Sequence, residues 1–477
     1  MTHHRDESLF YEKIYPHFQK ICKLRRPSGE ESEITEFIKN YAQKIPLLLV
    51  ESDTSGNILV HRPATKGLEH LPPLMFQGHL DMVCVPDKNI FPIRPAITNG
   101  WVHTEGTTLG ADNGIAVAIM MELMRYPFEK CLPLEFLFTT SEEIGLKGAG
   151  SIDSNKLQSR ADKLVNVDSE EIDYITIGCA GGRDIDIFTE ISYQPNQFKN
   201  TFSVTVTGPG GHSGILIHER IPNAIKVVSE GLLKASENND TAISGLSGGL
   251  AYNAIPATAN IIICSNSLSN VLLEVVFKEI AKKYSDYKPF SVTIENKETP
   301  HRIFKQENTQ KILRLLTELP HGVLKMNPET KGVLSSINLA MMSVSDTTVK
   351  IAMNTRSSDE LEIENNLNRV ESLCKQYPDT ATNKLEGYPG WRPNVNSDLL
   401  RVATASFEKV HGKKPQYLDI HAGLECGILM NKFSGIKEAI SIGPNLLDVH
   451  SVKERLEIAS TVEIWDIILE LINCYSS

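Results

Sequence analysis

Short apolar runs bounded by glycine or proline alternate with helix-period segments in the first part of the chain. Residues 74–77 form such a run after two prolines, which predicts a buried strand that ends next to His79. Further runs predict strands at residues 134–138 and 163–167. Residues 115–124 are apolar on every side, which predicts a buried helix. This alternation indicates an α/β sheet domain.

Two helices are predicted ahead of this sheet. Residues 9–24 carry apolar side chains near helical spacing. Ser28 and Glu31 have the spacing of a capping box, which predicts that a second helix begins there. The apolar face of that helix would carry Ile34, Phe37, Ile38 and Tyr41.

The pattern changes near residue 185 to strands alternating with long amphipathic helices. Strands are predicted at 202–206, 260–264, 291–294, 335–341 and 348–354, and helices at 222–235, 271–284, 309–317 and 359–376. A turn-rich stretch at 385–391 precedes further helices at 397–411 and 459–472. We therefore predict an α/β domain of residues 1–185 and 386–477, with a mixed, mostly parallel sheet between helices, and an inserted α+β domain of residues 186–385.

Composition limits the class of protein. The chain has 477 residues, 41% of them hydrophobic, which suffices for two or three cores. Its net charge of -11 argues against nucleic acid or an anionic membrane surface as a partner. The eight cysteines include no C-x-x-C pair, the N-terminal segment MTHHRDE is polar and charged, and no apolar run reaches membrane-spanning length. These features predict a cytoplasmic protein with reduced thiols.

Acidic residues and histidines follow the predicted strands. His79 and Asp81 are two residues apart, so on an extended backbone the carboxylate can accept the second N–H of the imidazole. Glu142 and Glu143 follow the strand at 134–138, and Asp168 follows the strand at 163–167. Taken alone, the adjacent glutamates would suit a surface loop. Burial of unpaired carboxylates is costly, however, and an acid or a histidine directly follows each of three predicted buried strands, which favours a shared site.

Two further residues complete the set. Asp112 lies at the start of the helix that contains residues 115–124, where an isolated aspartate would serve as an N-cap. His450 follows the apolar stretch 439–443. Two imidazoles and four carboxylates are what a pair of zinc-like ions needs if one carboxylate bridges them, with one acid left over as a base.

The sequence motifs in these segments resemble those of one family. The motifs G-H-L-D-M-V, G-A-D-N-G, T-S-E-E-I-G, N-V-D-S-E, G-P-G-G-H-S-G and D-V-H-S occur in the order found in aminoacyl-histidine dipeptidases, a branch of the di-zinc metallopeptidases. The resemblance covers nearly the whole chain. H-A-G-L-E-C-G at residues 421–427 is the stretch that points to this branch.

The resemblance implies a role for each residue. His79 and Asp168 would hold one metal ion, Glu143 and His450 the other, and Asp112 would bridge them, while Asp81 orients His79 and Glu142 is the general base. A cis peptide would join Asp112 to Asn113. The ions would be zinc, although mixed imidazole and carboxylate ligands also accept manganese or cobalt.

By the same resemblance the inserted domain is a lid. His212 would stabilise the oxyanion, and Asn253, Arg356 and His421 would bind the substrate, with the Arg356 guanidinium suited to a terminal carboxylate. From the residues alone, His212 could equally be a turn residue and Arg356 part of a surface ion pair. A doubled lid would present His212 within one chain, whereas a homodimer would present it across chains.

The resemblance implies a cytoplasmic metallopeptidase that cleaves unblocked dipeptides, of which Xaa-His types such as β-alanyl-histidine or glycyl-histidine are expected. A deacylase or an aminotripeptidase of the same clan is the alternative. A more distant alternative is a serine hydrolase that uses Ser247, because residues 245–249 match G-x-S-x-G. No buried strand leads into that match, so a glycine-rich loop is favoured.

Overall fold

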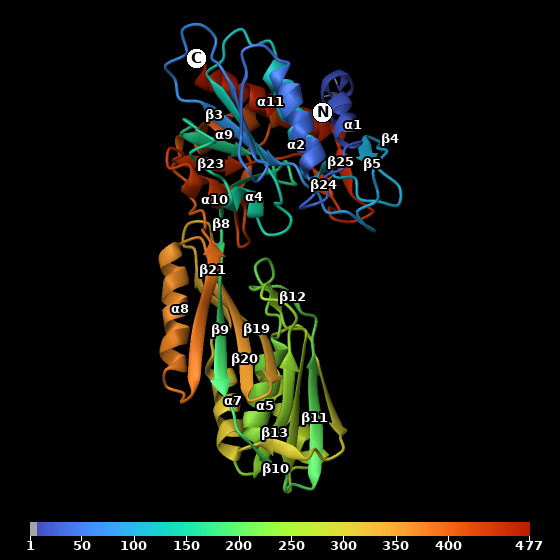
Figure 1. The fold of residues 1–477 in the computed structure, drawn as a ribbon, viewed down its shortest axis with the longest axis vertical. Helices are drawn as coiled ribbons and strands as arrows, with labels where there is room; N and C mark the ends of the chain where they lie inside the picture. The colour runs from blue at the N-terminus through green and yellow to red at the C-terminus, as the bar shows by residue number, and fades with distance from the viewer. Residues whose placement is uncertain (1–6) are drawn as a thin grey trace. The chain divides into compact units, whose positions relative to one another are not determined.

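The computed structural model describes residues 7–477, which form two compact units. Unit 1 holds the described residues up to Cys179 together with Trp391–Asp419 and Leu424–Ser477, and unit 2 holds Ala180–Gly390 and Ile420–Gly423 (Figure 1). Most of the charged N-terminus noted in the sequence lies outside the described residues. Within residues 7–477, no helix has the length and apolarity needed to cross a membrane.

Unit 1 is built on an eight-stranded sheet in the order β1-β2-β6-β3-β7-β23-β8-β22. β3 is parallel to β6 and β7, and β7 is parallel to β23, whereas β1 is antiparallel to β2, β2 to β6, and β8 to β23. We predicted a mixed, mostly parallel sheet between helices, and a mixed sheet is confirmed, with its parallel pairs at the centre. The strands are β1 (Leu49–Ser52), β2 (Ile58–Arg62), β3 (Leu74–His79), β6 (Leu134–Thr139), β7 (Lys163–Asn166), β8 (Tyr174–Cys179), β22 (Gln416–Ile420) and β23 (Glu438–Ser441).

Most helices of unit 1 share one apolar core with this sheet. α3 is buried along nearly its whole length, as its apolar sequence predicts, and it packs on β3. The helices are η1 (Phe10–Ile14), α1 (Tyr15–Ile21), α2 (Ser32–Gln43), α3 (Ala111–Arg125), α4 (Lys147–Gly150), α9 (Asp398–His411), α10 (Glu425–Lys432) and α11 (Ile458–Tyr475). A small sheet, β24-β25-β5-β4, contains Leu446–Leu447, Arg455–Glu457, Trp101–His103 and Ala96–Thr98.

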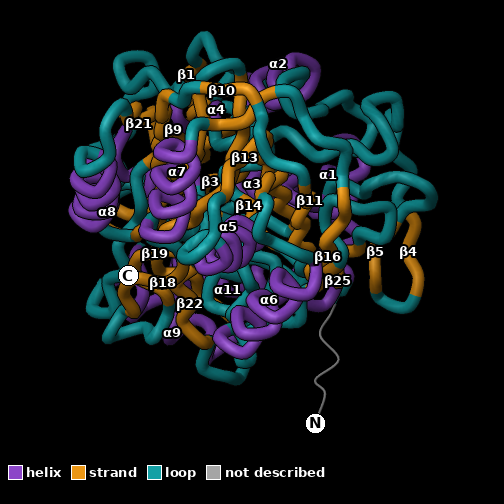
Figure 2. The backbone as a smooth tube through the Cα atoms, turned by 90° about the horizontal axis from the view of Figure 1, so that it is seen from below, coloured by secondary structure: helices purple, strands orange, loops and turns teal. Residues whose placement is uncertain are grey.

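Unit 2 is an antiparallel sheet covered by helices. The strand order is β16-β11-β15-β13-β19-β20-β9-β21, with β18 paired to β19. Figure 1 shows α8 beside β21, and α5 and α7 against the sheet, and Figure 2 distinguishes the helices and strands of both units by colour. The strands are β9 (Gly181–Glu190), β11 (Asn200–Thr207), β13 (Thr241–Gly248), β15 (Thr258–Ser265), β16 (Ser291–Asn296), β18 (Gly322–Met326), β19 (Val333–Ser345), β20 (Thr348–Ser357) and β21 (Thr380–Tyr388).

The remaining elements of unit 2 are four helices and two pairs of short strands. The helices α5 (Ala224–Ala235), α6 (Asn270–Lys283), α7 (Gln306–Glu318) and α8 (Glu360–Cys374) lie within a few residues of their predicted bounds. β10 (Tyr193–Pro195) pairs with β17 (Arg302–Phe304), and β12 (Gly211–His212) pairs with β14 (Ala254–Ile255).

The predicted capping box at the start of α2 is wrong. The Ser28 hydroxyl donates to the Met82 carbonyl at 3.4 Å, and α2 begins only at Ser32. Glu31 is buried, and its Oε1 accepts hydrogen bonds from the Gly29 N–H and from the Ser141 N–H and hydroxyl. The two side chains therefore fix the segments that carry Met82 and Ser141 and leave the helix uncapped.

The prediction of a glycine-rich loop at residues 245–249 is also wrong, because residues 245–248 belong to β13. Ser247 is an exposed residue of that strand, opposite Asn260 on one side and Ser343 on the other. A nucleophile elbow requires a sharp turn from a strand into a helix. An exposed position within a strand cannot supply that turn, so the geometry removes the serine-hydrolase alternative.

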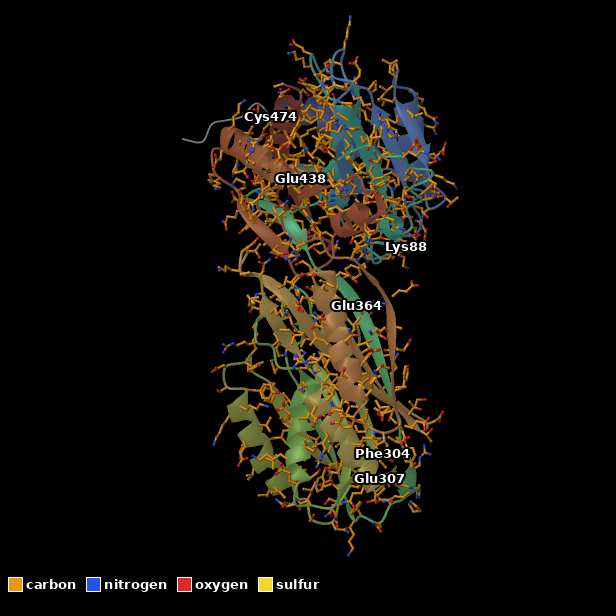
Figure 3. The ribbon with its side chains drawn as sticks, turned by 90° about the vertical axis from the view of Figure 1, so that its left-hand side faces the viewer. Lys88, Phe304, Glu307, Glu364, Glu438 and Cys474 are labelled. Carbon is orange, nitrogen blue, oxygen red and sulfur yellow. The ribbon has the colours of Figure 1, made fainter. Side chains whose placement is uncertain are left out.

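The described cysteines are all free thiols. Six are buried and Cys84 is partly buried, while Cys474 near the C-terminus is exposed and is labelled in Figure 3. Burial raises the pKa of several of these thiols, to about 12 for Cys22 and Cys179, because a thiolate is poorly solvated in an apolar interior.

Candidate metal centre

The parallel strands at the centre of the unit 1 sheet deliver acids and a histidine to one edge. β3 ends at His79, β6 leads into Glu142 and Glu143, and β7 leads into Asp168. Since these strands are parallel neighbours, their carboxyl ends meet, which is where open α/β sheets build their sites. Asp112 comes from the first turn of α3, which packs on β3.

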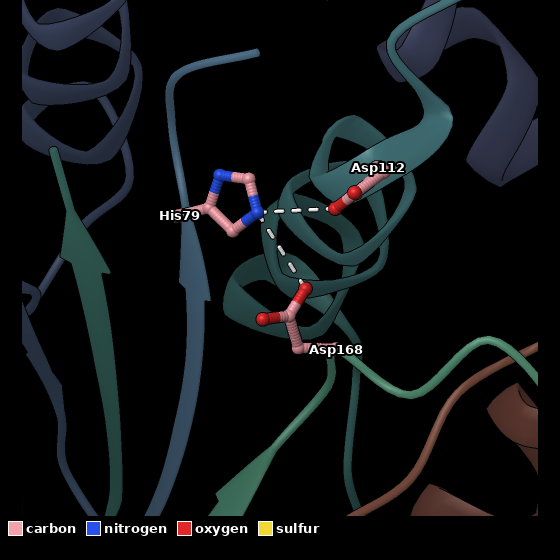
Figure 4. A group of neighbouring side chains, drawn as sticks. All are labelled: His79, Asp112 and Asp168. Carbon is pink, nitrogen blue, oxygen red and sulfur yellow. Dashed lines mark hydrogen bonds and ion pairs between the residues drawn. The ribbon is translucent and has the colours of Figure 1, made fainter. Parts of the chain in front are cut away.

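Two histidines share the carboxylate of Asp112. His79 Nε2 lies 3.1 Å from Asp112 Oδ1 and 3.6 Å from Asp168 Oδ1 (Figure 4). His450, from the loop between β24 and β25, places its Nε2 3.1 Å from Asp112 Oδ2 and 2.9 Å from Glu143 Oε1. The two oxygens of one carboxylate therefore face two different imidazoles, as a bridging ligand requires.

The donor atoms form three overlapping groups with the spacing of metal ligands. In each group one donor atom per residue lies within 4.8 Å of the others, and the groups are His79–Asp112–Asp168, His79–Glu142–Glu143 and Asp112–Glu143–His450. Imidazole nitrogens and carboxylate oxygens are the ligands of divalent zinc, manganese and cobalt. The residues present fit a pair of such ions.

The ionisation of the cluster follows from burial and close charges. Burial lowers the pKa of His79, but the carboxylates of Asp168, Asp112 and Asp81 outweigh burial and raise it well above its usual value. Hydrogen bonds to Asp112 and Glu143 raise the pKa of His450 to about 11. Burial and nearby carboxylates raise the pKa of Asp168 despite the charge of His79. Bound cations would reverse these shifts by favouring carboxylates and neutral imidazoles.

Asp81 holds more of the cluster than its sequence position suggests. Its Oδ1 lies 3.4 Å from His79 Nδ1, so the imidazole presents Nε2 to Asp112. Its two oxygens also accept the N–H groups of Glu142 at 2.9 Å and Glu143 at 3.2 Å. Burial raises the pKa of Asp81, but the bonds to His79 and the Glu142 N–H lower it to about 2. Asp81 thus fixes both the imidazole and the paired glutamates.

Asn113 connects three parts of the site, although no role was predicted for its side chain. The peptide bond between Asp112 and Asn113 is cis, as the family resemblance implies. The Asn113 side chain accepts the His79 N–H at 3.2 Å and donates to the Val167 carbonyl at 2.8 Å and to Asp168 Oδ1 at 2.5 Å. A Cβ at residue 78 would lie 2.3 Å from Asn113 Oδ1, which explains the glycine before His79.

Glu425 is a second residue without an assigned role, although it lies in the H-A-G-L-E-C-G motif. It is buried at the start of α10, and its Oε2 accepts hydrogen bonds from Gln77 at 2.5 Å and the Thr139 hydroxyl at 2.9 Å. Asn166 donates to Gln77 Oε1 at 2.7 Å. This network joins the ends of β6, β3 and β7 beneath the cluster, and burial raises the pKa of Glu425 to about 7.

The residues expected to bind substrate lie in unit 2. His212 in β12 faces Ala254 in β14, and the Ser213 N–H donates to the Asn253 carbonyl at 2.8 Å. A Cβ at Gly214 would lie 2.3 Å from the His421 carbonyl and 2.9 Å from His212 Cε1. These contacts gather three segments that are far apart in the sequence.

Arg356 lies in β20 and is not a surface residue. It is 5% exposed, and its Nη1 donates to the Tyr388 hydroxyl at 2.8 Å. No carboxylate of the described residues is within ion-pair distance of it, so the surface ion pair is excluded. Burial and then the charge of Arg356 lower the pKa of His212 and of His421, the latter to about 3.

Comparisons with known proteins bear on this geometry. The model of peptidase family M20/M25/M40 matches residues 75–473. The cytosol non-specific dipeptidase of Escherichia coli (strain K12) is 34% identical over 479 residues, which cover 97% of each chain. The crystal structure of aminoacylhistidine dipeptidase from Vibrio alginolyticus matches with a TM-score of 0.89 at 28% identity, over 99% of this chain and 98% of that one. Aminopeptidase PepT from Bacillus cereus ATCC 10987 has the same fold, with a TM-score of 0.59 at 17% identity, over 98% of this chain and 99% of that one.

Proposed function

Because this chain belongs to peptidase family M20/M25/M40 and is therefore a metallopeptidase, we propose that it hydrolyses dipeptides with a free N-terminus. The observation that carries the proposal is the carboxylate of Asp112, whose two oxygens face His79 and His450. The names of the Escherichia coli and Vibrio alginolyticus relatives support dipeptides as substrates, with Xaa-His dipeptides among them, and the first name supports a cytoplasmic location.

We assign two divalent ions to the cluster. His79 and Asp168 would hold one, Glu143 and His450 the other, and Asp112 would bridge them, with zinc favoured and manganese or cobalt also accepted by this ligand set. When bound, such ions acidify a water molecule and polarise the scissile carbonyl.

Glu142 is the proposed general base. It is adjacent to Glu143 but is not one of the residues that contact His450, and Asp81 fixes the backbone N–H groups of both glutamates. Burial raises the pKa of Glu142 to about 8, with the charges of Glu425 and Glu143 adding to the shift against that of His79. A glutamate beside a pair of bound cations is suited to accept a proton from water and donate it to the leaving amine.

The four residues in unit 2 are proposed to bind the peptide. His212 Nδ1 accepts the Ile215 N–H at 3.1 Å, so the proton of the neutral imidazole is on Nε2. A neutral N–H donor is suited to a carbonyl oxygen that becomes negative. Asn253 and His421 would contact the peptide, and Arg356 would bind its terminal carboxylate. The homodimer stays a prediction, which light scattering would test.

A dipeptide panel tests the proposal. We expect metal-reconstituted protein to hydrolyse glycyl-histidine, β-alanyl-histidine and other unblocked dipeptides, and to leave their N-acetylated forms and tripeptides nearly intact. Release of free histidine, followed by chromatography, is the readout, with metal-free protein as the control. Faster cleavage of the N-acetylated substrates would identify a deacylase, and faster cleavage of tripeptides would identify an aminotripeptidase.

Replacement of Arg356 by lysine tests carboxylate recognition. We expect KM for dipeptides to rise by about 10-fold or more, since lysine loses the two-pronged hydrogen bond to a carboxylate. KM for an analogue amidated at its C-terminus should change little. Arg183→Lys is the matched control, because Arg183 lies in the neighbouring strand β9 and pairs with Glu364, which Figure 3 labels. Equal effects of Arg356→Lys on the acid and the amide would contradict the assignment.

A further inference from the structure

A buried carboxylate outside the proposed ligand set holds the segment that carries Asp112. Glu454 is 2% exposed and lies 342 residues from Asp112 in the sequence. Its Oε2 accepts the N–H groups of Leu109 at 2.8 Å and Gly110 at 2.9 Å. Its Oε1 accepts the N–H groups of Ala111 at 2.7 Å and Asp112 at 3.2 Å. Four consecutive backbone donors thus converge on one side chain.

This contact orders the turn that precedes the regular part of α3, because Asp112 and Asn113 have non-helical backbone angles. The N-cap position of α3 is Gly110, which has a φ of 69° and no side chain with which to accept a hydrogen bond. Glu454 supplies that acceptor from another part of the chain.

Arg26 completes the bracing of the same segment. Its side chain is fully buried and donates to the carbonyls of Leu80 and Asp81 at 3.1 Å each, and to the carbonyl of Gly110. A Cβ at Gly110 would lie 2.5 Å from Arg26 Nη2, so the approach depends on glycine. The carbonyls on either side of Asp81 and the turn before Asp112 are therefore tied to one guanidinium.

Glu454 also belongs to the loop that carries His450. The two residues are four positions apart, between β24 and β25, and the Glu454 N–H donates to the Ser451 carbonyl at 3.2 Å. His450 has a φ of 59°, in the left-handed region that non-glycine residues rarely occupy. Its imidazole is partly exposed, with 46% of the side chain accessible, so its own packing holds it only in part.

We propose that Glu454 is a positioning residue that sets Asp112 and His450 in the relative placement needed to bind one metal ion. The inference rests on the proposed function. Because Glu454 anchors the backbone of Asp112 and lies on the His450 loop, loss of its carboxylate would separate these two ligands. The other site shares only Asp112 with this one and keeps His79 and Asp168, which contact Asn113 and Asp81, so it would be less affected.

The test is a calorimetric titration of metal-free protein with Zn²⁺. In Glu454→Gln an amide NH₂ group replaces one carboxylate oxygen. Two backbone N–H groups then lose their acceptor and face another donor. We expect one of two sites to weaken by about 10–100-fold, the usual effect of losing a residue that supports a metal ligand. The other site, which shares only Asp112 with the first, should weaken less, and raised Zn²⁺ should restore most of kcat.

Glu135→Gln is the matched control for loss of stability alone. Glu135 is equally buried in β6, and its carboxylate accepts the Arg160 N–H at 3.1 Å and the Ser159 hydroxyl, at the opposite end of the strand from Glu142. We expect a lowered Tm with unchanged Zn²⁺ affinities. If Glu454→Gln behaves in this way, with two wild-type sites, Glu454 is only a structural residue and the inference is overturned.

A milder variant covers the case in which Glu454→Gln does not fold. Glu454→Asp keeps the charge, but its shorter side chain cannot reach all four N–H groups, so an intermediate loss of affinity at the same site is expected. Wild-type affinity in Glu454→Asp would overturn the inference. Failure of the wild-type protein itself to bind Zn²⁺ would instead overturn the proposed function.

Discussion

Replacement of Glu142 by glutamine is expected to lower kcat by about 10²–10⁴-fold while both metal ions stay bound. Glutamine keeps the size of the side chain but cannot accept a proton from water and donate it to the leaving amine. Asp81 accepts the backbone N–H of residue 142, so the substitution should leave the local structure intact. Steady-state kinetics and metal content, measured on the same preparation, provide the readout.

Glu143→Gln is the control for this prediction. Glu143 Oε1 lies 2.9 Å from His450 Nε2, so its replacement should weaken one metal site as well as activity. The two variants therefore differ in metal stoichiometry even where both are inactive. A Glu142→Gln protein that loses a metal ion would exchange the two roles, and one with near-normal turnover would remove Glu142 from the mechanism.

Removal of the metal ions by a chelator is expected to abolish hydrolysis and lower Tm together. Five proposed ligands come from five separate segments between residues 79 and 450, so ions bound only by the folded chain stabilise it. A ligand present at 1,000 times its Kd contributes about 4 kcal/mol. Melting curves and activity with and without chelator, and after metal is restored, test the coupling. Full activity at an unchanged Tm would contradict the metal centre.

The ligand candidates could be predicted because each follows a strand or begins a helix. His79, Glu143 and Asp168 come after apolar runs, and parallel strands bring such ends together without further information. Asp112 and His450 lie 338 residues apart, so their contact was inferred only from family resemblance. Local sequence patterns describe neighbouring residues and cannot predict a contact between residues so far apart in the chain.

The residues that support the ligands were missed for a related reason. Glu425 and Glu454 act on groups more than 280 residues away, and Glu454 does so through backbone N–H groups, which are the same in every sequence. For Glu31 the error was the opposite one. Its spacing from Ser28 predicted a local contact in a helix cap, but its carboxylate accepts the N–H of residue 141. The strands β9 and β21 were missed since glycine and charged residues interrupt their alternation.

The chain enters unit 2 a second time at Ile420–Gly423, and this short segment limits how the protein could be divided into separate domains. Cys179 and Trp391 exchange two backbone hydrogen bonds of 2.9 Å, so removal of residues 180–390 could be closed by a short linker. Residues 420–423 would then lose their partners, because the Ala180 N–H donates to the Ile420 and Ala422 carbonyls and His421 Nε2 lies 2.7 Å from the Ser336 hydroxyl. Glu425, two residues after this segment, accepts a hydrogen bond from the Gln77 side chain beneath the cluster. Residues 180–390 therefore cannot be deleted or exchanged alone. A chimera that takes unit 2 from a relative would have to take residues 420–423 as well.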